Sequence, residues 1–359
     1  MLKKLVNEAY FTLRITTTGP LLVRSGQATI SGPDMTPVLT FRNGRSEIFL
    51  PGSSLKGVFR SHSEKIVCSL KPRVVCYPFS GNEDKIVDLA QHDYRVSCGE
   101  MFTRLVKPEG GEERNLEQNT LRAALEARTD LAYAYSCPTC RLFGSTGFIG
   151  RIAISDAYLA SGSFTEQRDG VGIDRLTGGA SHGAKFELEV VSTGVIFETD
   201  IHLRNFEIWQ LGMLFVILQD LEDELIHIGS GRSRGLGKVV AQISPQGRNG
   251  RPGGFVISTI RGSREASKMP ANEVWGLGRW LNDGSYGTQS DDSLAFTGQV
   301  ESRERGIRNE RAFTGEALDS LRQGAIQSFI KRMQAWDVPP EREWTASLKA
   351  ALLEKGVAR

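Results

Sequence analysis

Apolar and polar residues alternate over several short segments of this chain. Within residues 10–18, Phe11, Leu13 and Ile15 share one face, and polar residues occupy the other. A period of two residues is typical of strands with one buried face. The same alternation predicts further strands over residues 151–159, 185–191, 196–204 and 238–243.

Two longer segments carry apolar residues at helical spacing. Over about residues 54–69, Leu55, Phe59 and Ile66 fall on one face of a helix, and a second such stripe spans about residues 206–223. Together with the strands, these helices give the order strand, helix, strand, strand, helix, strand. That order predicts an α+β, ferredoxin-like core with large insertions.

The predicted core accounts for only part of the chain, which we divide into a domain over residues 1–245 and a C-terminal extension over residues 246–359. Within the domain, residues 69–136 are rich in loop-forming residues, with one helix expected over 116–131. Residues of about 161–185 are rich in glycine, serine and charge, which predicts a protruding loop or hairpin. The extension is expected to be partly helical, and it either docks on a neighbouring subunit or extends the core.

The composition is that of a soluble protein with a hydrophobic core, since 40% of the residues are hydrophobic and 24% are charged. The chain has no run of about 18 apolar residues, and its first residues lack the apolar core of a signal peptide. We therefore expect a cytoplasmic protein with no membrane partner. Because the formal net charge is only +2, any nucleic-acid-binding surface must be local and balanced by acidic residues elsewhere.

Five cysteines in a chain expected in the cytoplasm favour a metal site over disulfides. Two residues separate Cys137 from Cys140, a spacing at which two thiolates can reach one tetrahedral ion. Substitutes for a further ligand are Cys68, which falls within the first predicted helix, and His92. Reduced cysteines that hold no metal are the alternative. The preferred ligands for a structural Zn²⁺, which would help to hold the insertion together, are Cys76, Cys98, Cys137 and Cys140.

The segment FLPGSSLKGVFR, residues 49–60, has the features of an anion-binding helix start. Ser53 and Ser54 supply hydroxyl groups at the predicted N-cap, and Lys56 and Arg60 lie on the polar face of the helix. A helix N-terminus presents unpaired N–H groups and the positive end of the peptide dipoles. The segment therefore predicts a seat for a phosphodiester, and an ordinary capped amphipathic helix is the alternative.

A second candidate segment is GSGRSRGLG, residues 229–237. Its glycines allow the backbone to approach a ligand closely, and Arg232 and Arg234 supply positive charge. The segment is no Walker phosphate loop, because the Gly-Lys-Ser/Thr ending and the following helix are both missing. A glycine turn with no ligand is the alternative. We expect the two positively charged segments to lie side by side and to grip one sugar-phosphate chain.

Five segments now identify a resemblance: GPLLVRSG, LPGSSLKGVFRS, CPTCRLFGS, GVGIDRLTGGASHGAKFELEVV and GSGRSRGLGKV. In that order they resemble the RAMP superfamily, specifically the repeated backbone subunit of type III CRISPR effector complexes. The resemblance covers about residues 8–245. It implies an RRM-like, ferredoxin-type core that stacks with other effector subunits into a filament and binds guide RNA through its backbone.

The resemblance also assigns parts to individual segments. Lys56 and Arg60 correspond to guide-binding positions, and the glycine-rich segment corresponds to the family's signature loop beside the RNA. Residues 168–185 match a thumb hairpin that reaches over the neighbouring subunit's RNA and disrupts its pairing with the target. With the residues argued above, the RNA-binding candidates are Ser53, Ser54, Lys56, Arg60, Arg175, Gly231, Arg232 and Arg234.

The family's target-cleaving residue is an aspartate in the loop after the first strand, and Asp34 in PDMTPV fits that place. Where the thumb splays the target RNA, a ribose 2′-OH can align with its own phosphate. A carboxylate there can hold a divalent cation such as Mg²⁺ or accept the proton of the hydroxyl, which leaves a 2′,3′-cyclic phosphate. Asp34 as an ordinary turn residue is the alternative.

The long insertion and the extension depart from the familiar subunit, and two alternatives to catalysis by Asp34 therefore stay open. One alternative is a scaffold that binds guide RNA and cuts nothing. The other is a guide-processing endonuclease, a branch of the same superfamily that uses histidine as acid or base. His182, in the thumb segment, is the candidate for that chemistry.

Overall fold

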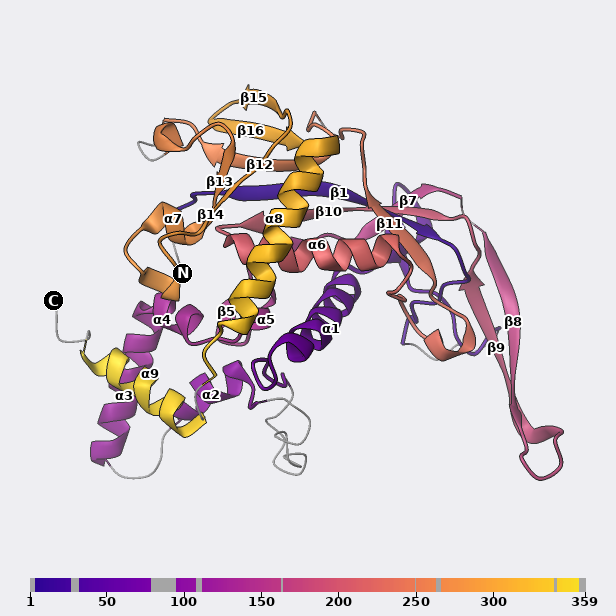
Figure 1. Cartoon of the computed structure of the whole chain (residues 1–359). Helices are drawn as coiled ribbons and strands as arrows, with labels where there is room; N and C mark the ends of the chain where they lie inside the picture. The colour runs from indigo at the N-terminus through magenta and orange to yellow at the C-terminus, as the bar shows by residue number, and fades with distance from the viewer. Residues whose placement is uncertain are drawn as a thin grey trace.

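The computed structural model describes residues 4–26, 32–78, 95–107, 112–162, 164–248, 250–262, 266–338 and 341–354. Its centre is a ten-stranded antiparallel sheet in which β1 is flanked on one side by β10 and on the other by β11 and β12 (Figure 1). The bounds of these strands are Glu8–Thr17 for β1, Ile196–Arg204 for β10, Val239–Ile243 for β11 and Phe255–Ile260 for β12.

The predicted ferredoxin-like core is present. Strands β6 (Ile152–Ile154) and β7 (Ala157–Ser161) pair with β10, so the core order is β11, β1, β10 and then β6 with β7. Helices α1 (Gly52–Leu70) and α6 (Ile208–Glu222) pack on this sheet through one apolar cluster that includes Phe59. Two helices joined to four antiparallel strands in this order make the α+β fold that the sequence predicts.

The strand predicted over residues 151–159 is instead two short strands, β6 and β7. The chain breaks between them because Asp156 turns toward α1, where its carboxylate accepts a hydrogen bond from the Gly52 N–H at 2.8 Å. Beyond β7, a hairpin completes this side of the sheet, with Asn43 and Gly44 at positive φ in its turn. Its strands are β2 (Leu39–Arg42) and β3 (Arg45–Leu50).

The C-terminal extension adds to the core sheet. Strand β12 pairs with β1, and β16 and β15 follow outward. Helix α8 crosses α6 (Figure 1), and Gly212 makes the close approach possible, since a Cβ there would lie 2.0 Å from Ala325 O. The strands were not predicted, because the charged residues of this hairpin hide its alternation. The bounds are β13 Glu273–Trp275, α7 Leu277–Leu281, β14 Ser293–Ala295, β15 Glu301–Arg305, β16 Arg308–Phe313 and α8 Gly315–Gln334.

The insertion is far more helical than the sequence predicts. Its apolar residues form a separate cluster that also contains Trp344, Leu348 and Leu352 of α9 (Glu341–Glu354). Because α9 lies more than 200 residues later in the chain, no local pattern within the insertion reveals this partner. The elements of this region are α2 Cys98–Leu105, α3 Glu112–Ala127, α4 Thr129–Ala134, α5 Pro138–Phe143, β4 Gly144–Ser145 and β5 Phe148–Ile149.

The predicted protruding hairpin consists of β8 (Thr165–Ile173) and β9 (Ala180–Val191), which extend away from the body of the molecule (Figure 1). Its tip carries Leu176, whose side chain is 97% exposed. In the described part of the chain, no helix has both the length and the apolar character needed to span a membrane.

Candidate metal centre and nucleic-acid interface

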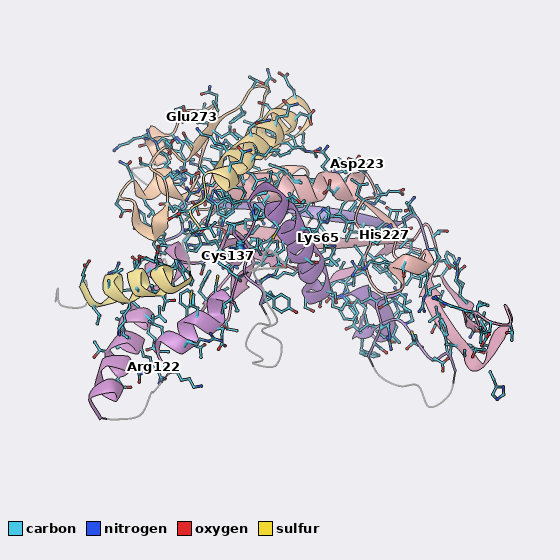
Figure 2. All side chains as sticks on the ribbon, turned by 60° about the horizontal axis from the view of Figure 1, so that its bottom comes forward. Lys65, Arg122, Cys137, Asp223, His227 and Glu273 are labelled. Atoms are coloured by element: carbon cyan, nitrogen blue, oxygen red, sulfur yellow. The ribbon has the colours of Figure 1, made fainter. Side chains whose placement is uncertain are left out.

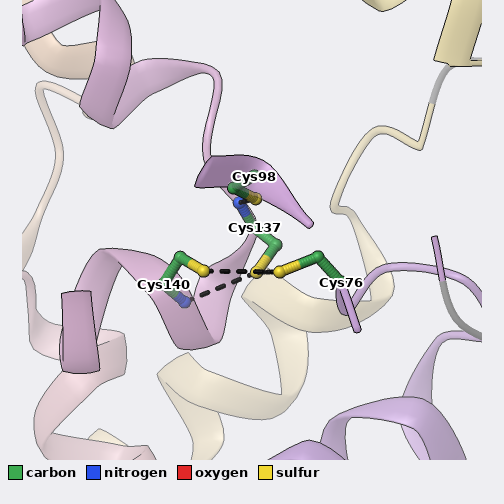
Figure 3. Close-up of side chains that lie close together, drawn as sticks. All are labelled: Cys76, Cys98, Cys137 and Cys140. Carbon is green, nitrogen blue, oxygen red and sulfur yellow. Dashed lines mark hydrogen bonds between the residues drawn. The ribbon is translucent and has the colours of Figure 1, made fainter. Parts of the chain in front are cut away.

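Four cysteines from separate segments meet beside α1. Cys76 follows α1, Cys98 begins α2, and Cys137 and Cys140 lie at the start of α5 (Figure 3). All four Sγ atoms lie within 4.8 Å of one another, with Cys76 3.4 Å from Cys140 and 3.6 Å from Cys137. Sulfur atoms about 3.8 Å apart are expected around a tetrahedral Zn²⁺ with bonds of about 2.3 Å. The predicted ligands are therefore brought together in a geometry that fits one tetrahedral ion.

The two substitute metal ligands named from the sequence are Cys68 and His92. Cys68 lies on α1 and packs against the main core, apart from the cluster. His92 lies outside the described residues.

The start of helix α5 holds Cys137 and Cys140 close together. Cys137 is the N-cap of α5, and its sulfur accepts a hydrogen bond from the Cys140 N–H at 3.4 Å. Burial opposes the thiolate, but hydrogen bonds from the other three cysteines hold the pKa of Cys137 well below its usual range. A thiolate is the form that binds a metal.

Two arginines from separate segments of the chain contact the sulfur cluster. Arg60 Nη2 donates to Cys140 Sγ at 3.4 Å, and Arg95 Nη2 donates to Cys98 Sγ at 3.8 Å. Four thiolates around Zn²⁺ form a doubly negative centre, which two guanidinium groups neutralise. No local sequence pattern indicates this role, because Arg60 and Cys140 are 80 positions apart.

Arg60 connects the cysteine cluster with a groove beside α1. Its other nitrogens donate to Gly144 O at 3.0 Å and to Glu64 Oε1 at 2.8 Å. With Lys56 and residues 143–150, Arg60 lines a groove of about 780 Å³. Burial lowers the pKa of Lys56, and the positive charge of Arg60 acts in the same direction. This groove is one candidate surface for a phosphate chain.

The predicted serine cap at the start of α1 is wrong. The helix begins at Gly52 with Pro51 as its N-cap, and no side chain of the N-cap residue accepts a hydrogen bond there. Instead, Asp156 accepts a hydrogen bond from the Gly52 N–H, so a carboxylate already takes one of the unpaired N–H groups at this end of the helix. Ser53 and Ser54 fall within the first turn of the helix, and they stay predicted RNA-binding residues.

The glycine-rich loop presents its two arginines to solvent. Gly231 and Gly235 have φ of 73° and 80° and bracket a single 3-10 turn, Arg232–Arg234. Only glycine adopts this left-handed backbone readily. The guanidinium of Arg234 lies 5.3 Å from the centre of the Phe186 ring at the base of the thumb hairpin. The loop is therefore a tight turn that contacts β9 through Arg234.

The loop that carries Asp34 docks on the same strand. The Glu187 N–H donates to Asp34 Oδ2 at 2.8 Å, and the Glu189 N–H donates to Met35 O at 2.9 Å. Asp34 is exposed. Asp34 and Arg234 thus contact neighbouring residues of β9, at the point where the hairpin leaves the body.

Residues 14–240 match the family model described as the RAMP superfamily. The chain belongs to the RAMP superfamily. Membership of this superfamily indicates a CRISPR-associated RNA-binding subunit. The matched range includes the cysteine cluster, the thumb hairpin and the whole glycine-rich loop. No curated protein matches the chain.

Within this RAMP protein, the candidate RNA-binding residues fall into two groups. Lys56 and Arg60 lie beside the cysteine cluster, and the groove that they line contains no residue of the glycine-rich loop. Figure 2 shows the separation, with Cys137 near the middle of the molecule and His227, just before that loop, toward the thumb end. We expected the two segments to lie side by side and to grip one sugar-phosphate chain, and this stays a prediction.

Arg175 lies at the exposed tip of the RAMP thumb. The neighbouring Asp174 organises the tip, because its Oδ1 accepts from the N–H groups of Leu176 and Thr177, both at 2.8 Å. Arg175 is therefore held on an ordered turn between β8 and β9, whereas Asp34 contacts Glu187, in the second half of β9.

Proposed function

We propose that this RAMP protein is a backbone subunit of a type III CRISPR effector complex that binds guide RNA through its phosphates and cleaves the complementary target RNA with Asp34. The observation that carries the proposal is the meeting of Asp34 and Arg234 at adjacent residues of β9. A carboxylate and a guanidinium at the base of a projecting hairpin can act on the same phosphodiester if RNA crosses that base.

The geometry supports separate roles for the Asp34 carboxylate and for the guanidinium groups of the glycine-rich loop. The Glu187 N–H fixes the direction of the Asp34 carboxylate, which would accept the proton of a ribose 2′-OH. Arg232 and Arg234 would hold phosphates of the RNA, because guanidinium groups match phosphate oxygens with two parallel hydrogen bonds. A divalent cation such as Mg²⁺, if Asp34 binds one, would stabilise the charge that develops on the phosphate. Other subunits and the guide RNA complete the site.

The deciding experiment uses the reconstituted complex with its guide RNA and a labelled complementary target. We expect Asp34→Ala to abolish the cuts made by this subunit, while guide binding stays at the level of the unaltered protein. Asp169→Ala, which removes an exposed carboxylate on β8 of the same hairpin, is the matched control and should leave the cuts in place. If Asp34→Ala leaves every fragment unchanged, the protein is a scaffold that binds RNA without cutting it.

The third candidate, guide processing, has a separate test. His182 lies on the exposed part of β9, toward the tip of the hairpin. Incubation of precursor guide RNA with the unaltered protein and with His182→Ala distinguishes it. Processing that disappears with His182→Ala would replace target cleavage by Asp34 as the proposed activity.

A further inference from the structure

A pocket of about 550 Å³ lies where the insertion meets the C-terminal helices. Its walls come from the residue ahead of α2, the turn after α4, α5, the end of α8 and the start of α9. These elements lie at the opposite end of the molecule from the thumb hairpin (Figure 1). The volume is within the range of about 300–1,000 Å³ that is usual for small-ligand pockets.

Three arginines from distant parts of the sequence line this pocket: Arg95, Arg141 and Arg332. Two tryptophan rings position them. The Trp336 ring has Arg141 at 4.5 Å and Arg332 at 4.8 Å from its centre, and Arg95 lies 4.8 Å from the centre of Trp344. A guanidinium stacked on an indole ring keeps its charge. Part of each group already donates within the chain: Arg141 to Ser136 O and Ala134 O, Arg332 to Gly287 O, and Arg95 to Cys98 Sγ. The pocket is therefore cationic and has flat aromatic surfaces beside its charges.

Each of these arginines has a buried nitrogen that lacks a hydrogen-bond partner among the described residues: Arg95 Nε, Arg141 Nη1 and Arg332 Nε. The nearest carboxylate to Arg141 Nη1, that of Glu207, is 3.7 Å away, which is too long for a hydrogen bond. Buried donors without an acceptor are rare, because each loses its interaction with water. Because these nitrogens are closed to solvent, a ligand in the pocket can accept hydrogen bonds from them only if the guanidinium groups turn toward it, and that turn would pair donors that now have no acceptor.

The acidic residues of the pocket do not accept hydrogen bonds from these arginine nitrogens. Asp337 and Glu343 also line the pocket, but both are exposed, whereas Arg141 is only 4% exposed. The positive charge is thus deeper than the negative charge. An anion that enters the pocket meets guanidinium groups at its inner wall.

We propose that this pocket binds a phosphate-bearing ligand of the size of one nucleotide. The phosphate would accept hydrogen bonds from the arginines, and the base would lie against Tyr135, which is more exposed than the buried rings of Trp336 and Trp344. The same chemistry comes from a free nucleotide or from the phosphorylated end of an RNA. This site is separate from the RNA-binding surface proposed above and does not depend on it.

The test measures binding to the full-length, zinc-loaded protein by calorimetry and by tryptophan fluorescence. The probes are AMP, adenosine, inorganic phosphate and a short RNA with either a 5′-phosphate or a 5′-hydroxyl. Arg332→Gln removes one guanidinium of the pocket, and Lys331→Gln removes one charge from the adjacent exposed position as the matched control. Ser347→Glu adds a carboxylate to the wall on α9 and leaves all three arginines in place.

We expect AMP to bind more tightly than adenosine or inorganic phosphate. Arg332→Gln and Ser347→Glu should each weaken AMP binding by about tenfold or more, and Lys331→Gln should leave it unchanged. Tighter binding of the 5′-phosphorylated RNA than of the 5′-hydroxyl RNA, lost in the same two variants, would identify an RNA end as the source. The proposal is overturned if neither AMP nor 5′-phosphorylated RNA binds, or if Arg234→Gln at the glycine-rich loop reduces binding as much as Ser347→Glu does.

Discussion

At the scale of single residues, Arg60 shows how tertiary contacts change a residue's part. Its position on the polar face of α1 predicts contact with RNA, yet its guanidinium group reaches both the sulfur of Cys140 and the backbone of Gly144. The pKa of Arg60 is raised, because the neighbouring thiolates and Glu64 together outweigh the effect of burial. Arg60 therefore stays charged while it joins the cysteine cluster to the groove.

Replacement of Arg60 by lysine should weaken metal retention. Lysine keeps the charge but cannot reach two acceptors with a planar fork, and loss of an outer-shell partner typically costs about 10–100-fold in metal affinity. The measurement is competition for Zn²⁺ with a coloured chelator. Lys56→Gln, one turn earlier in the same groove, is the control and should retain Zn²⁺ fully. Equal retention by Arg60→Lys would show that the contact with Cys140 does not support the metal centre.

Asp292 gives a second prediction at this scale. It accepts hydrogen bonds from Ile208 N–H at 2.9 Å and from Gly278 N–H at 3.0 Å. Burial, helped by the negative charge of Glu207, raises the pKa of Asp292 to about 7. Because the folded pKa exceeds the unfolded one, the folded state binds this proton more tightly. The resulting stabilisation is complete below the unfolded pKa of about 4 and is lost as the pH rises to about 7.

The free energy of unfolding of the unaltered protein, relative to that of Asp292→Asn, should therefore fall between about pH 4 and pH 7. Asparagine cannot ionise, so the variant lacks this pH dependence. Urea unfolding of both proteins at several pH values measures the difference, and effects of pH on metal binding cancel because they are common to both. A difference that stays constant or rises with pH would contradict the raised pKa.

At the scale of elements, the cysteine-bearing insertion and the sheet have separate apolar clusters. The main cluster joins the sheet with α1, α6 and α8, whereas the cluster of the insertion contains the four cysteines themselves. Metal binding to four thiolates supplies folding free energy to a region with a small core. The two parts should therefore respond differently to loss of the metal.

Removal of Zn²⁺ by a chelator, or Cys137→Ser, should open the insertion and α9 and leave the sheet folded. Hydrogen exchange resolved by peptide should show faster exchange over residues 98–143 and 341–354, with β1 and α6 still protected. Cys68→Ser changes a cysteine outside the cluster and should leave exchange unaltered. Exchange that accelerates evenly over the whole chain would mean that the metal centre holds the entire fold.

At the scale of the whole molecule, the C-terminal extension and the core share one sheet and one helical layer. Helix α8 lies so close to α6 that Gly212 of α6 faces the backbone of Ala325. The extension therefore helps to form the structure on which the candidate RNA-binding elements rest.

Gly212→Ala should separate α6 from α8 and destabilise the protein by about 2–4 kcal/mol, since the added methyl group meets backbone that cannot move aside. Gly57→Ala is the matched control, because a Cβ at this position of α1 has no atom within 4 Å. Alanine is the better helix former, so Gly57→Ala should stabilise the protein by about 0.5–1 kcal/mol. Denaturant unfolding measures both, and an equal gain from the two variants would mean that α8 does not press on α6.

The sequence by itself predicted the ferredoxin-like order of elements, because the apolar period of β1, β10, α1 and α6 is strong and local. It also predicted the four cysteines as one set, since their chemistry limits them to few arrangements. Its failures lie where an element depends on a distant partner, as with the helices of the insertion that pack on α9 and the charged hairpin β15–β16 that pairs with β12.

Only the tertiary structure decided which groups act together. It placed Asp156 at the start of α1, Arg60 against Cys140, and Asp34 beside the base of the thumb hairpin. It also gathered Arg95, Arg141 and Arg332 into one pocket. The physical reason is the same in each case. Periodicity reports which face of an element is buried, whereas a hydrogen bond between residues 80 or more positions apart depends on how the whole chain packs.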